Sequence, residues 1–574
     1  MRTGAEALCA ALEAAGVRHA FGLPGTQDVE LHGALRRSGI TFVNTTHELA
    51  ASFMSGAYFR ASGRLAPIFA IAGPGFTHAL TGLAEAAQDS AATLLIVGAP
   101  PPGPRRFQFQ ALDQAAMAGP VVKAVIRLED ARLVERETRR AVALALEGEP
   151  GPVMLQWTQA ALADPAPPTA GAVSAEPGPV HAPGPGFEAA VRDAAALLGA
   201  SQRPVVMAGQ GAMGATTYVA ALAERLGAAV VTTTSGRGLL PEDHPLSMAF
   251  ELARGGLEGL DALLEAADAV LVVGCKLGAA STGDFRLSLP PARLVRVDAS
   301  REVLDAGYPA AVPVVSSAEE FLPALLRRLG PTPPPPGAGW RPEQLASWRQ
   351  RLAQGATGRL PEVAVRGLEP PTPQALFAAL RRALPRHGMV VTDSGEHQEL
   401  TRRWLDVLSP GGLMVPSDFQ SMGFGLPAAI GAALATPGRP VVAVVGDGAF
   451  AMTAMELLTA VRLRLQLVVV VLADGSLNRV RLQQLAAHGR SHGVELLNPG
   501  FAAFAEAVGA DHELVEGDAE AVFRRALQRP GVTLLEVRLG DSVAVHRSRA
   551  RGLVRRLPGI PLARGMVRWF KGRA

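Results

Sequence analysis

The chain has 574 residues, 48% of them apolar, so we expect several domains with full hydrophobic cores. No apolar run approaches the roughly 18–20 residues of a membrane helix, and the N-terminus lacks the basic and apolar regions of a secretory signal. Two distant cysteines, Cys9 and Cys275, argue against a disulfide framework and favour a cytoplasmic protein.

The formal net charge of +3 does not indicate a nucleic-acid-binding protein. Nine lysines and arginines and no acids lie between Arg547 and Ala574. The rest of the chain holds 46 basic and 52 acidic residues, so the excess of positive charge belongs to a tail. This tail, 546–574, also carries apolar residues, which allows contact with an anionic membrane surface. Because Pro558 and Pro561 interrupt any long helix there, we favour a docked or partly ordered tail.

Two proline-rich stretches, Asp164–Gly186 and Gly330–Gly339, divide the chain into three segments. In each segment short apolar runs typical of strands alternate with amphipathic helices. The sequence therefore predicts an α/β protein of three domains with parallel sheets flanked by helices. We assign the domains to residues 1–165, 187–330 and 365–545, followed by the tail.

In the first segment, a predicted strand at Thr41–Asn44 is followed by Thr46-His47-Glu48 and a helix. A zinc-binding helix would need a second histidine four positions after His47, where Ala51 stands, so we reject that interpretation. A solvated glutamate that the helix dipole stabilises in the first turn remains an alternative for Glu48.

The middle segment contains Gly209-Gln210-Gly211-Ala212-Met213-Gly214 after a predicted strand. This matches the dinucleotide pattern G-x-G-x-x-G, which is weak evidence alone. No acid follows at the end of the next predicted strand, Val230–Thr234, so the usual ribose contact is missing. We therefore favour a structural use of these glycines.

In the third segment, two valine-rich strands are predicted at Val441–Val445 and Leu467–Ala473, with a helix over Met452–Leu463 and Glu456 at its polar edge. The strands are followed by Gly446-Asp447-Gly448 and by Asp474-Gly475-Ser476. The carboxyl ends of parallel strands lie side by side, so the two carboxylates would repel each other unless a hard cation such as Mg²⁺ lies between them. Two helix-capping aspartates are the alternative.

The Gly446-Asp447-Gly448 turn and the second turn about 25 residues later resemble the diphosphate motif of thiamine diphosphate enzymes. The resemblance is closest to the acetolactate synthase, pyruvate oxidase and benzoylformate decarboxylase superfamily. It implies that Asp447, Asp474 and the Ser476 carbonyl bind Mg²⁺, and that Gly446, Gly448 and Ala449 contact the diphosphate. Where the family has Asn-Asn, this chain has Ala473-Asp474.

The first segment resembles the same family. Its Thr46-His47-Glu48 is similar to an Arg-His-Glu helix start, which implies that Glu48 hydrogen-bonds N1′ of the cofactor's aminopyrimidine. Phe21–Gly25 resembles the first turn of the family, which places Gly25 at the cofactor. Phe109-Gln110 resembles a loop that lines the reaction pocket, although Ala111 replaces a common glutamate. His78 stands where acetolactate synthases usually have asparagine, so it is a candidate for proton transfer or for a structural hydrogen bond.

Two further stretches of the third segment complete the resemblance. Gly395-Glu396-His397-Gln398 is similar to a Gly-Gln-His-Gln loop over the diphosphate, and Gln420–Ala429 is similar to the turn beneath the thiazolium ring. Gln420 would bind the pyrimidine, and Met422 would be the apolar wedge that bends the cofactor. Arg479, Arg481 and Gln483, where relatives recognise substrate, do not match the acetolactate synthase pattern.

The resemblance implies a pyrimidine-binding, a central Rossmann-like and a diphosphate-binding domain. In the family the cofactor lies between the first domain of one subunit and the third of another, which implies a homodimer or homotetramer. The central domain binds FAD, ADP or nothing in different relatives, and no motif here indicates FAD. C-terminal tails of several relatives cover the active site, which is a second possibility for this tail.

We expect acetolactate synthase-like decarboxylation or carboligation of a 2-oxo acid with thiamine diphosphate and Mg²⁺. The alternatives are a 2-hydroxyacyl-CoA lyase or oxalyl-CoA decarboxylase type of enzyme, and a catalytically silent homologue that binds the cofactor.

Overall fold

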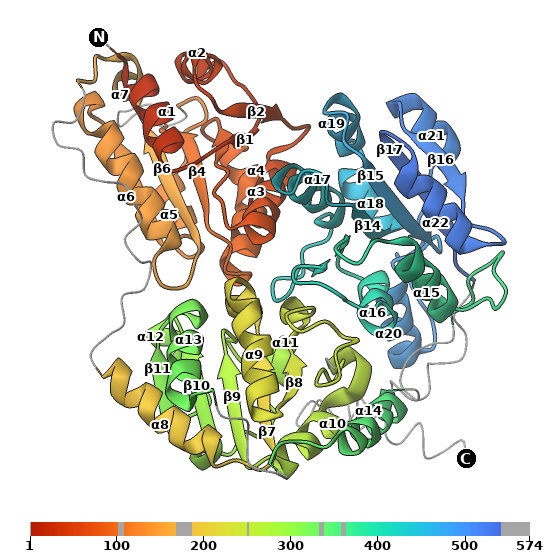
Figure 1. Ribbon diagram of the computed structural model, residues 1–574. Coiled ribbons are helices and arrows are strands. Elements are labelled where there is room, and N and C mark those ends of the chain that lie inside the picture. Colours follow the sequence, from red (N-terminus) through yellow and green to blue (C-terminus); the bar gives the residue numbers. More distant parts are fainter. Residues whose placement is uncertain are drawn as a thin grey trace.

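The computed structural model describes residues 2–100, 108–167, 186–249, 252–331, 338–356 and 363–540, and the predicted tail lies outside these ranges. The described residues form three parallel β-sheets flanked by helices, so the predicted fold class is confirmed. In Figure 1 the N-terminal domain lies at the upper left, the C-terminal domain at the upper right and the central domain below both. No helix within the described ranges has the length and hydropathy to cross a membrane.

The N-terminal domain is built on a six-stranded sheet in the order β2-β1-β3-β4-β6-β5. Its strands are β1 (His19–Gly22), β2 (Thr41–Asn44), β3 (Ile68–Ala70), β4 (Thr93–Gly98), β5 (Ala124–Leu128) and β6 (Pro152–Trp157). Its helices are α1 (Gly4–Ala14), α2 (Val29–Arg37), α3 (Glu48–Ser62), α4 (Pro74–Gln88), α5 (Gln114–Ala118), η1 (Ala131–Leu133), α6 (Val134–Leu146) and α7 (Gln159–Ala163). All six residues of β4 are buried, as expected for a parallel strand that is covered on both faces.

The central domain has a five-stranded sheet in the order β11-β10-β9-β7-β8. Its strands are β7 (Pro204–Ala208), β8 (Ala229–Thr232), β9 (Ala269–Val273), β10 (Leu294–Asp298) and β11 (Val312–Val315). Its helices are α8 (Phe187–Gly199), η2 (Gln210–Ala215), α9 (Thr216–Leu226), η3 (Thr234–Gly236), α10 (Leu252–Ala266), α11 (Ala279–Thr282), η4 (Pro291–Arg293), α12 (Arg301–Asp305) and α13 (Ala318–Leu329). Helix α14 (Pro342–Ala356) follows the second proline-rich stretch and packs against α10, so it adds to the core of this domain.

The C-terminal domain has a second six-stranded sheet in the order β13-β12-β14-β15-β17-β16. Its strands are β12 (Met389–Thr392), β13 (Leu413–Met414), β14 (Val441–Gly446), β15 (Leu467–Ala473), β16 (Asp511–Leu514) and β17 (Val532–Arg538). Its helices are α15 (Pro373–Ala383), α16 (Glu396–Trp404), α17 (Gly425–Ala435), α18 (Asp447–Thr453), α19 (Glu456–Arg462), α20 (Asn478–His488), α21 (Phe501–Val508) and α22 (Ala519–Gln528). The two predicted valine-rich strands are present as the central pair, β14 and β15.

The N- and C-terminal domains share one hydrophobic core, because α3 and α17 pack against each other between the two sheets (Figure 1). Residues from both sheets, among them Leu95 of β4 and Val469 of β15, belong to this core. The two helices approach so closely that a Cβ atom on Gly431 would lie 2.3 Å from the backbone oxygen of Met54. The glycine therefore sets how closely the two domains can pack.

The structure corrects two details of the predicted helix over Met452–Leu463. It is divided into α18 and α19, because the amides of Leu457 and Leu458 bond three residues back, to Ala454 and Met455, in a tighter turn than an α-helix. Glu456 is not on a polar edge but buried, and its carboxylate accepts hydrogen bonds from the amide and hydroxyl of Thr46 in the N-terminal domain.

We expect Gly431→Ala to destabilise the protein by about 1–3 kcal/mol, because the added methyl group meets rigid backbone. Gly33→Ala in α2 is the matched control: the nearest atom to its added Cβ is a mobile arginine nitrogen at 3.8 Å. It should be neutral or stabilising by up to about 1 kcal/mol. Guanidinium denaturation of the two variants checks this prediction, and equal effects would contradict it.

Candidate functional site

The predicted catalytic residues of the N-terminal domain gather at the carboxyl ends of its strands. Glu48 is the first residue of α3 and is only 7% exposed. Its Oε2 atom lies 3.0 Å from Nδ1 of His78 on α4. The ring of His47, which caps α3 by accepting the amide of Leu49, stacks on His78 with centroids 4.4 Å apart. The half-exposed His78 thus connects the buried carboxylate with the surface of the site.

Gln110 and Gly25 both lie close to the turn before α4, next to Glu48. A Cβ atom on Gly73 would lie 2.9 Å from Cβ of Gln110, and one on Gly75 would lie 3.1 Å from Oε1 of Glu48. Gln110 also accepts a hydrogen bond from Gln27 at 2.6 Å. Gly25 packs on Ile71, which contacts Gly75 from the other side. Gly25, Glu48, His78 and Gln110 therefore form one cluster, which we call the Glu48 cluster.

In the C-terminal domain, Asp447 organises the turn between β14 and α18. Its Oδ2 atom accepts hydrogen bonds from the amides of Asp474 and Gly475 and from the side chain of Asn498, at 3.1, 2.7 and 2.8 Å. Its Oδ1 atom accepts one, from the amide of Gly448. The carboxylate is only 4% exposed. Asp447 thereby fixes the turn at Asp474–Ser476 relative to the turn at Gly446–Gly448.

Asp474 lies beside Asp447, as the strand pairing predicts. Its Oδ1 atom accepts hydrogen bonds from the amide and the hydroxyl of Ser476, at 3.0 and 3.2 Å. Burial, together with the charge of Asp447, raises the pKa of Asp474 to about 6. Asp447, Asp474 and Ser476 thus lie together, and the charge of Asp447 adds to burial in opposing the ionisation of Asp474.

The loop at the start of α16 lies against the same turn. His397 sits between two glycines: a Cβ atom on Gly446 would lie 2.6 Å from its Nδ1, and one on Gly395 would lie 2.6 Å from its Cε1. Its Nε2 atom is buried and has no hydrogen-bond partner in the part of the chain that the structure describes, and burial lowers the pKa of this histidine to about 3. Glu396 is also buried, and Gln398 donates to the backbone oxygen of Pro416.

The turn that carries Gln420 and Met422 is held by a buried aspartate. Asp393 accepts the amides of Gly423 and Gly425 at 3.0 and 2.6 Å, and burial raises its pKa to about 7. Gln420 adopts a left-handed backbone conformation with φ of 63° and donates to the carbonyls of Pro416 and Ser417. The methyl group of Met422 lies 3.7 Å from the position of a Cβ on Gly448.

We call this second set the Asp447 cluster; its members are Gly395, Glu396, His397, Gln398, Gln420, Met422, Gly446, Asp447, Gly448, Ala449, Asp474 and Ser476. Ala449 is a buried residue of α18, two positions after Asp447. The Glu48 cluster and the Asp447 cluster belong to different domains of the chain.

Sequence reasoning missed three residues that shape the site. Asp393 follows β12 as Asp447 and Asp474 follow β14 and β15, so its position at a strand end was a usable signal. Asn498 lies in a loop far along the chain, and nothing local marks it as a partner of Asp447. Glu85 of α4 lies in the N-terminal domain but accepts the amide of Ser421, next to Met422, at 2.9 Å.

The three domains enclose a cavity of about 860 Å³ between them. It lies at the carboxyl ends of the strands of the central domain and reaches Gln420 of the C-terminal domain. Glycines of the G-x-G-x-x-G stretch line this cavity, and Gly209 and Gly211 also pack on the backbone at Gly274, at distances that leave no room for a side chain. Their structural use stays a prediction. The basic groups Arg60 and Lys276 at the cavity are paired with Asp89 and Glu149, at 2.5 and 2.6 Å.

Comparison with known families covers all three domains. Residues 2–117, 191–325 and 393–537 match, respectively, the N-terminal TPP binding domain, the central domain and the C-terminal TPP binding domain of thiamine pyrophosphate enzymes. The chain belongs to this family. The predicted resemblance is therefore confirmed.

Individual relatives match along nearly the whole chain. A probable 2-ketoarginine decarboxylase of Pseudomonas aeruginosa is 34% identical over 93% of this chain and 94% of its own length. A probable acetolactate synthase large subunit of Methanocaldococcus jannaschii is 28% identical, over 94% and 93%. The large subunit of acetolactate synthase isozyme 1 of Escherichia coli is 28% identical, over 95% of both chains.

The residues present fit thiamine diphosphate and a divalent cation. The ring of His397 lies against Gly395 and Gly446, and its buried Nε2 atom has no hydrogen-bond partner among the described residues, so it is available to a ligand at this loop. Burial and the charge of Asp447 both raise the pKa of Asp474, and a cation would relieve the part that is due to repulsion. Oxygen donors of the kind that Asp447, Asp474 and Ser476 offer are those that Mg²⁺ prefers.

Glu85→Gln tests whether the carboxyl group of Glu85 has a raised pKa where the N- and C-terminal domains meet next to Met422. Burial, with a contribution from Asp89, raises the pKa of Glu85 to about 8, whereas an unfolded glutamate titrates near 4.5. The folded wild type therefore binds the extra proton between these values, and its stability falls as pH rises from about 4.5 to about 8. The variant stays neutral, so we expect it to gain about 1 kcal/mol or more relative to wild type between pH 5 and pH 8.

Guanidinium denaturation at pH 5, 6.5 and 8 measures this gain. The control is Glu30→Gln, the same chemical change at an exposed position of α2, whose stability should follow wild type with pH. If the curves of Glu85→Gln and wild type were parallel, the buried carboxyl group would not have a raised pKa.

Proposed function

We propose that this protein is a thiamine diphosphate- and Mg²⁺-dependent enzyme that decarboxylates a 2-oxo acid. The observation that carries the proposal is the presence of two clusters in one chain: a buried glutamate that contacts a histidine in one domain, and two neighbouring aspartates in the other. When bound, thiamine diphosphate supplies an electron sink for cleavage of the bond next to a carbonyl.

In this proposal the residues have separate tasks. Asp447, Asp474 and the Ser476 carbonyl hold Mg²⁺, which binds the diphosphate, and His397 donates to the diphosphate. Gln420 and Met422 orient the pyrimidine ring. Glu48 holds a proton at N1′, and its contact with His78 provides a route for proton exchange with solvent. Gln110 lines the reaction pocket beside the Gly73 turn.

The two clusters are proposed to meet between subunits of a homodimer or homotetramer. Large apolar side chains are exposed near both of them in sequence, which supports the proposal. Phe109, Leu112 and Met117 flank Gln110, Met452, Met455 and Leu458 follow Asp447, Val480 follows Asp474, and Leu497 precedes Asn498. Exposed apolar side chains that form one contiguous patch mark an interface.

The fate of the product distinguishes two versions of the reaction. Acetolactate synthase-like carboligation is supported by several relatives of that name. Simple decarboxylation is supported by the relative with 34% identity, named a probable 2-ketoarginine decarboxylase. It is also supported by His78, a group that can exchange a proton where acetolactate synthases usually have asparagine. Product analysis with a short aliphatic 2-oxo acid and with 2-ketoarginine separates an aldehyde from an acetolactate-type product.

Glu48→Gln should lower the rate of CO₂ release from the accepted 2-oxo acid by about 100-fold or more, because the amide cannot exchange the proton. The affinity for thiamine diphosphate should change little by comparison. Assays of CO₂ release and cofactor titration measure the two effects, with the exposed Glu30→Gln as control. Turnover by Glu48→Gln at the wild-type rate would contradict the proposed role of this residue.

Removal of Mg²⁺ with EDTA should abolish activity, and added Mg²⁺ should restore it. Asp447→Ala should weaken Mg²⁺ binding by about 10-fold or more, since it removes a ligand and the acceptor that fixes both turns. Asp474→Asn should keep measurable activity, because it installs the family's residue and retains an oxygen ligand. Titration with Mn²⁺, followed by electron paramagnetic resonance, ranks the affinities; equal affinities in wild type and Asp447→Ala would contradict the metal assignment.

A further inference from the structure

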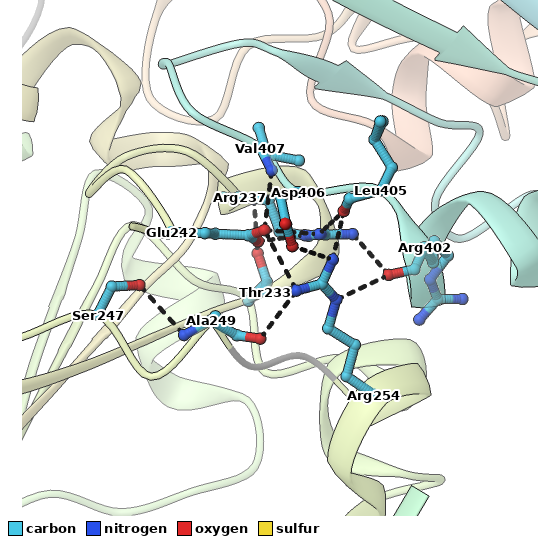
Figure 2. Close-up of polar contacts among 11 residues, drawn as sticks. Thr233, Arg237, Glu242, Ser247, Ala249, Arg254, Arg402, Leu405, Asp406 and Val407 are labelled. Carbon is cyan, nitrogen blue, oxygen red and sulfur yellow. Dashed lines mark hydrogen bonds and ion pairs between the residues drawn. The ribbon is translucent and has the colours of Figure 1, made fainter. Parts of the chain in front are cut away.

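Helix α16 connects the Asp447 cluster with the central domain. At its amino end, His397 lies against Gly446, the residue before Asp447. At its carboxyl end, the backbone oxygens of Arg402 and Leu405 face two arginines of the central domain (Figure 2). The helix has nine residues, so its length is about 13 Å. A short, regular helix transmits a displacement of one end to the other.

We call Arg237, Glu242 and Arg254 the arginine clamp (Figure 2). Arg237 binds both oxygens of Glu242, at 2.6 and 2.9 Å, and donates to the carbonyls of Arg402 and Leu405, at 2.7 and 2.5 Å. Arg254 donates to the same two carbonyls and to Asp406. Glu242 also accepts the amide of Val407 and donates its own amide to the Val407 carbonyl.

The clamp is buried and charge-balanced at its centre. The side chain of Arg237 is 0% exposed, and that of Glu242 is 4% exposed. Burial opposes ionisation of Glu242, but the charges of Arg237 and Arg254 outweigh it and lower its pKa. Both guanidinium groups lie at the negative end of the α16 dipole, where cations are favoured. The last carbonyls of α16, which have no partner inside the helix, are satisfied by another domain.

We propose that Arg237 and Arg254, oriented by Glu242, are positioning residues for the cofactor: they fix the carboxyl end of α16 and thereby hold His397 at the diphosphate site. This inference rests on the proposed function, since it assigns the purpose of α16 to cofactor binding. It extends that function to the central domain, which reaches the Asp447 cluster through α16.

The chain offers a matched control for domain attachment alone. Arg386 and Asp243 form a second ion pair between the same two domains, at 2.6 and 2.7 Å, next to Glu242 in sequence. Both side chains are half-exposed, and this pair does not bond the end of α16. Arg386→Met/Asp243→Asn removes an inter-domain ion pair without touching the clamp.

The test uses the full-length protein and thiamine diphosphate with Mg²⁺. The main variant is Arg237→Met/Glu242→Leu, which removes both charges together and so avoids an unpaired buried charge. Arg254→Met is a second variant, at a less buried position, that leaves the Arg237–Glu242 pair intact. We expect the dissociation constant of the cofactor to rise about 10-fold or more in the main variant and by less in Arg254→Met, with no change in the control.

Hydrogen–deuterium exchange over residues 396–404 provides a readout that does not depend on the cofactor. The amides of α16 should exchange faster in both clamp variants and at the wild-type rate in the control. A role in general stability alone would instead lower the melting temperature without changing cofactor affinity in the folded protein.

The outcomes separate the two hypotheses. If wild type binds thiamine diphosphate and the clamp variants bind it equally well, the positioning role is wrong and the proposed function stands. If wild type does not bind the cofactor, the proposed function fails, and the positioning role fails with it. Unchanged exchange of α16 in both folded clamp variants would overturn the inference irrespective of cofactor binding.

Discussion

The candidate site depends on one constraint, the meeting of parallel strands at a common edge. β12, β14 and β15 are neighbours in one sheet, and each is followed by an aspartate: Asp393, Asp447 and Asp474. The first two accept backbone amides and thereby fix the turns around them. Asp474 lies beside Asp447, and burial together with the charge of Asp447 raises its pKa. The same edge therefore produces both a rigid frame and a place for a cation.

Much of the fold could be predicted from the sequence, because its signals are local. Runs such as Val441–Val445 and Leu467–Leu472 are apolar at every position, which is typical of strands covered on both faces, and both are found as predicted. The family motifs identified the residues of both clusters, and the comparisons confirm the family. The position of Asp447 beside Asp474 also followed from strand order alone.

Interactions between distant segments could not be predicted. Helical spacing predicts Glu456 on a polar edge, yet it is buried. Thr46 of another domain donates two hydrogen bonds that satisfy its carboxylate there. Arg237 and Glu242 follow an ordinary strand–turn region, and their role depends on carbonyls more than 160 positions away. Such contacts leave no periodicity or spacing in the sequence, since only the packed domains bring the partners together.

The crossing of α3 and α17 has a consequence for biosynthesis. The face of α3 around Met54 is covered by Gly431 and its neighbours, which leave the ribosome much later. At ordinary elongation rates the delay between these two positions is roughly 20–75 seconds. During this interval the face of α3 that α17 covers in the folded protein is exposed, and exposed apolar surface of this kind favours aggregation and chaperone binding.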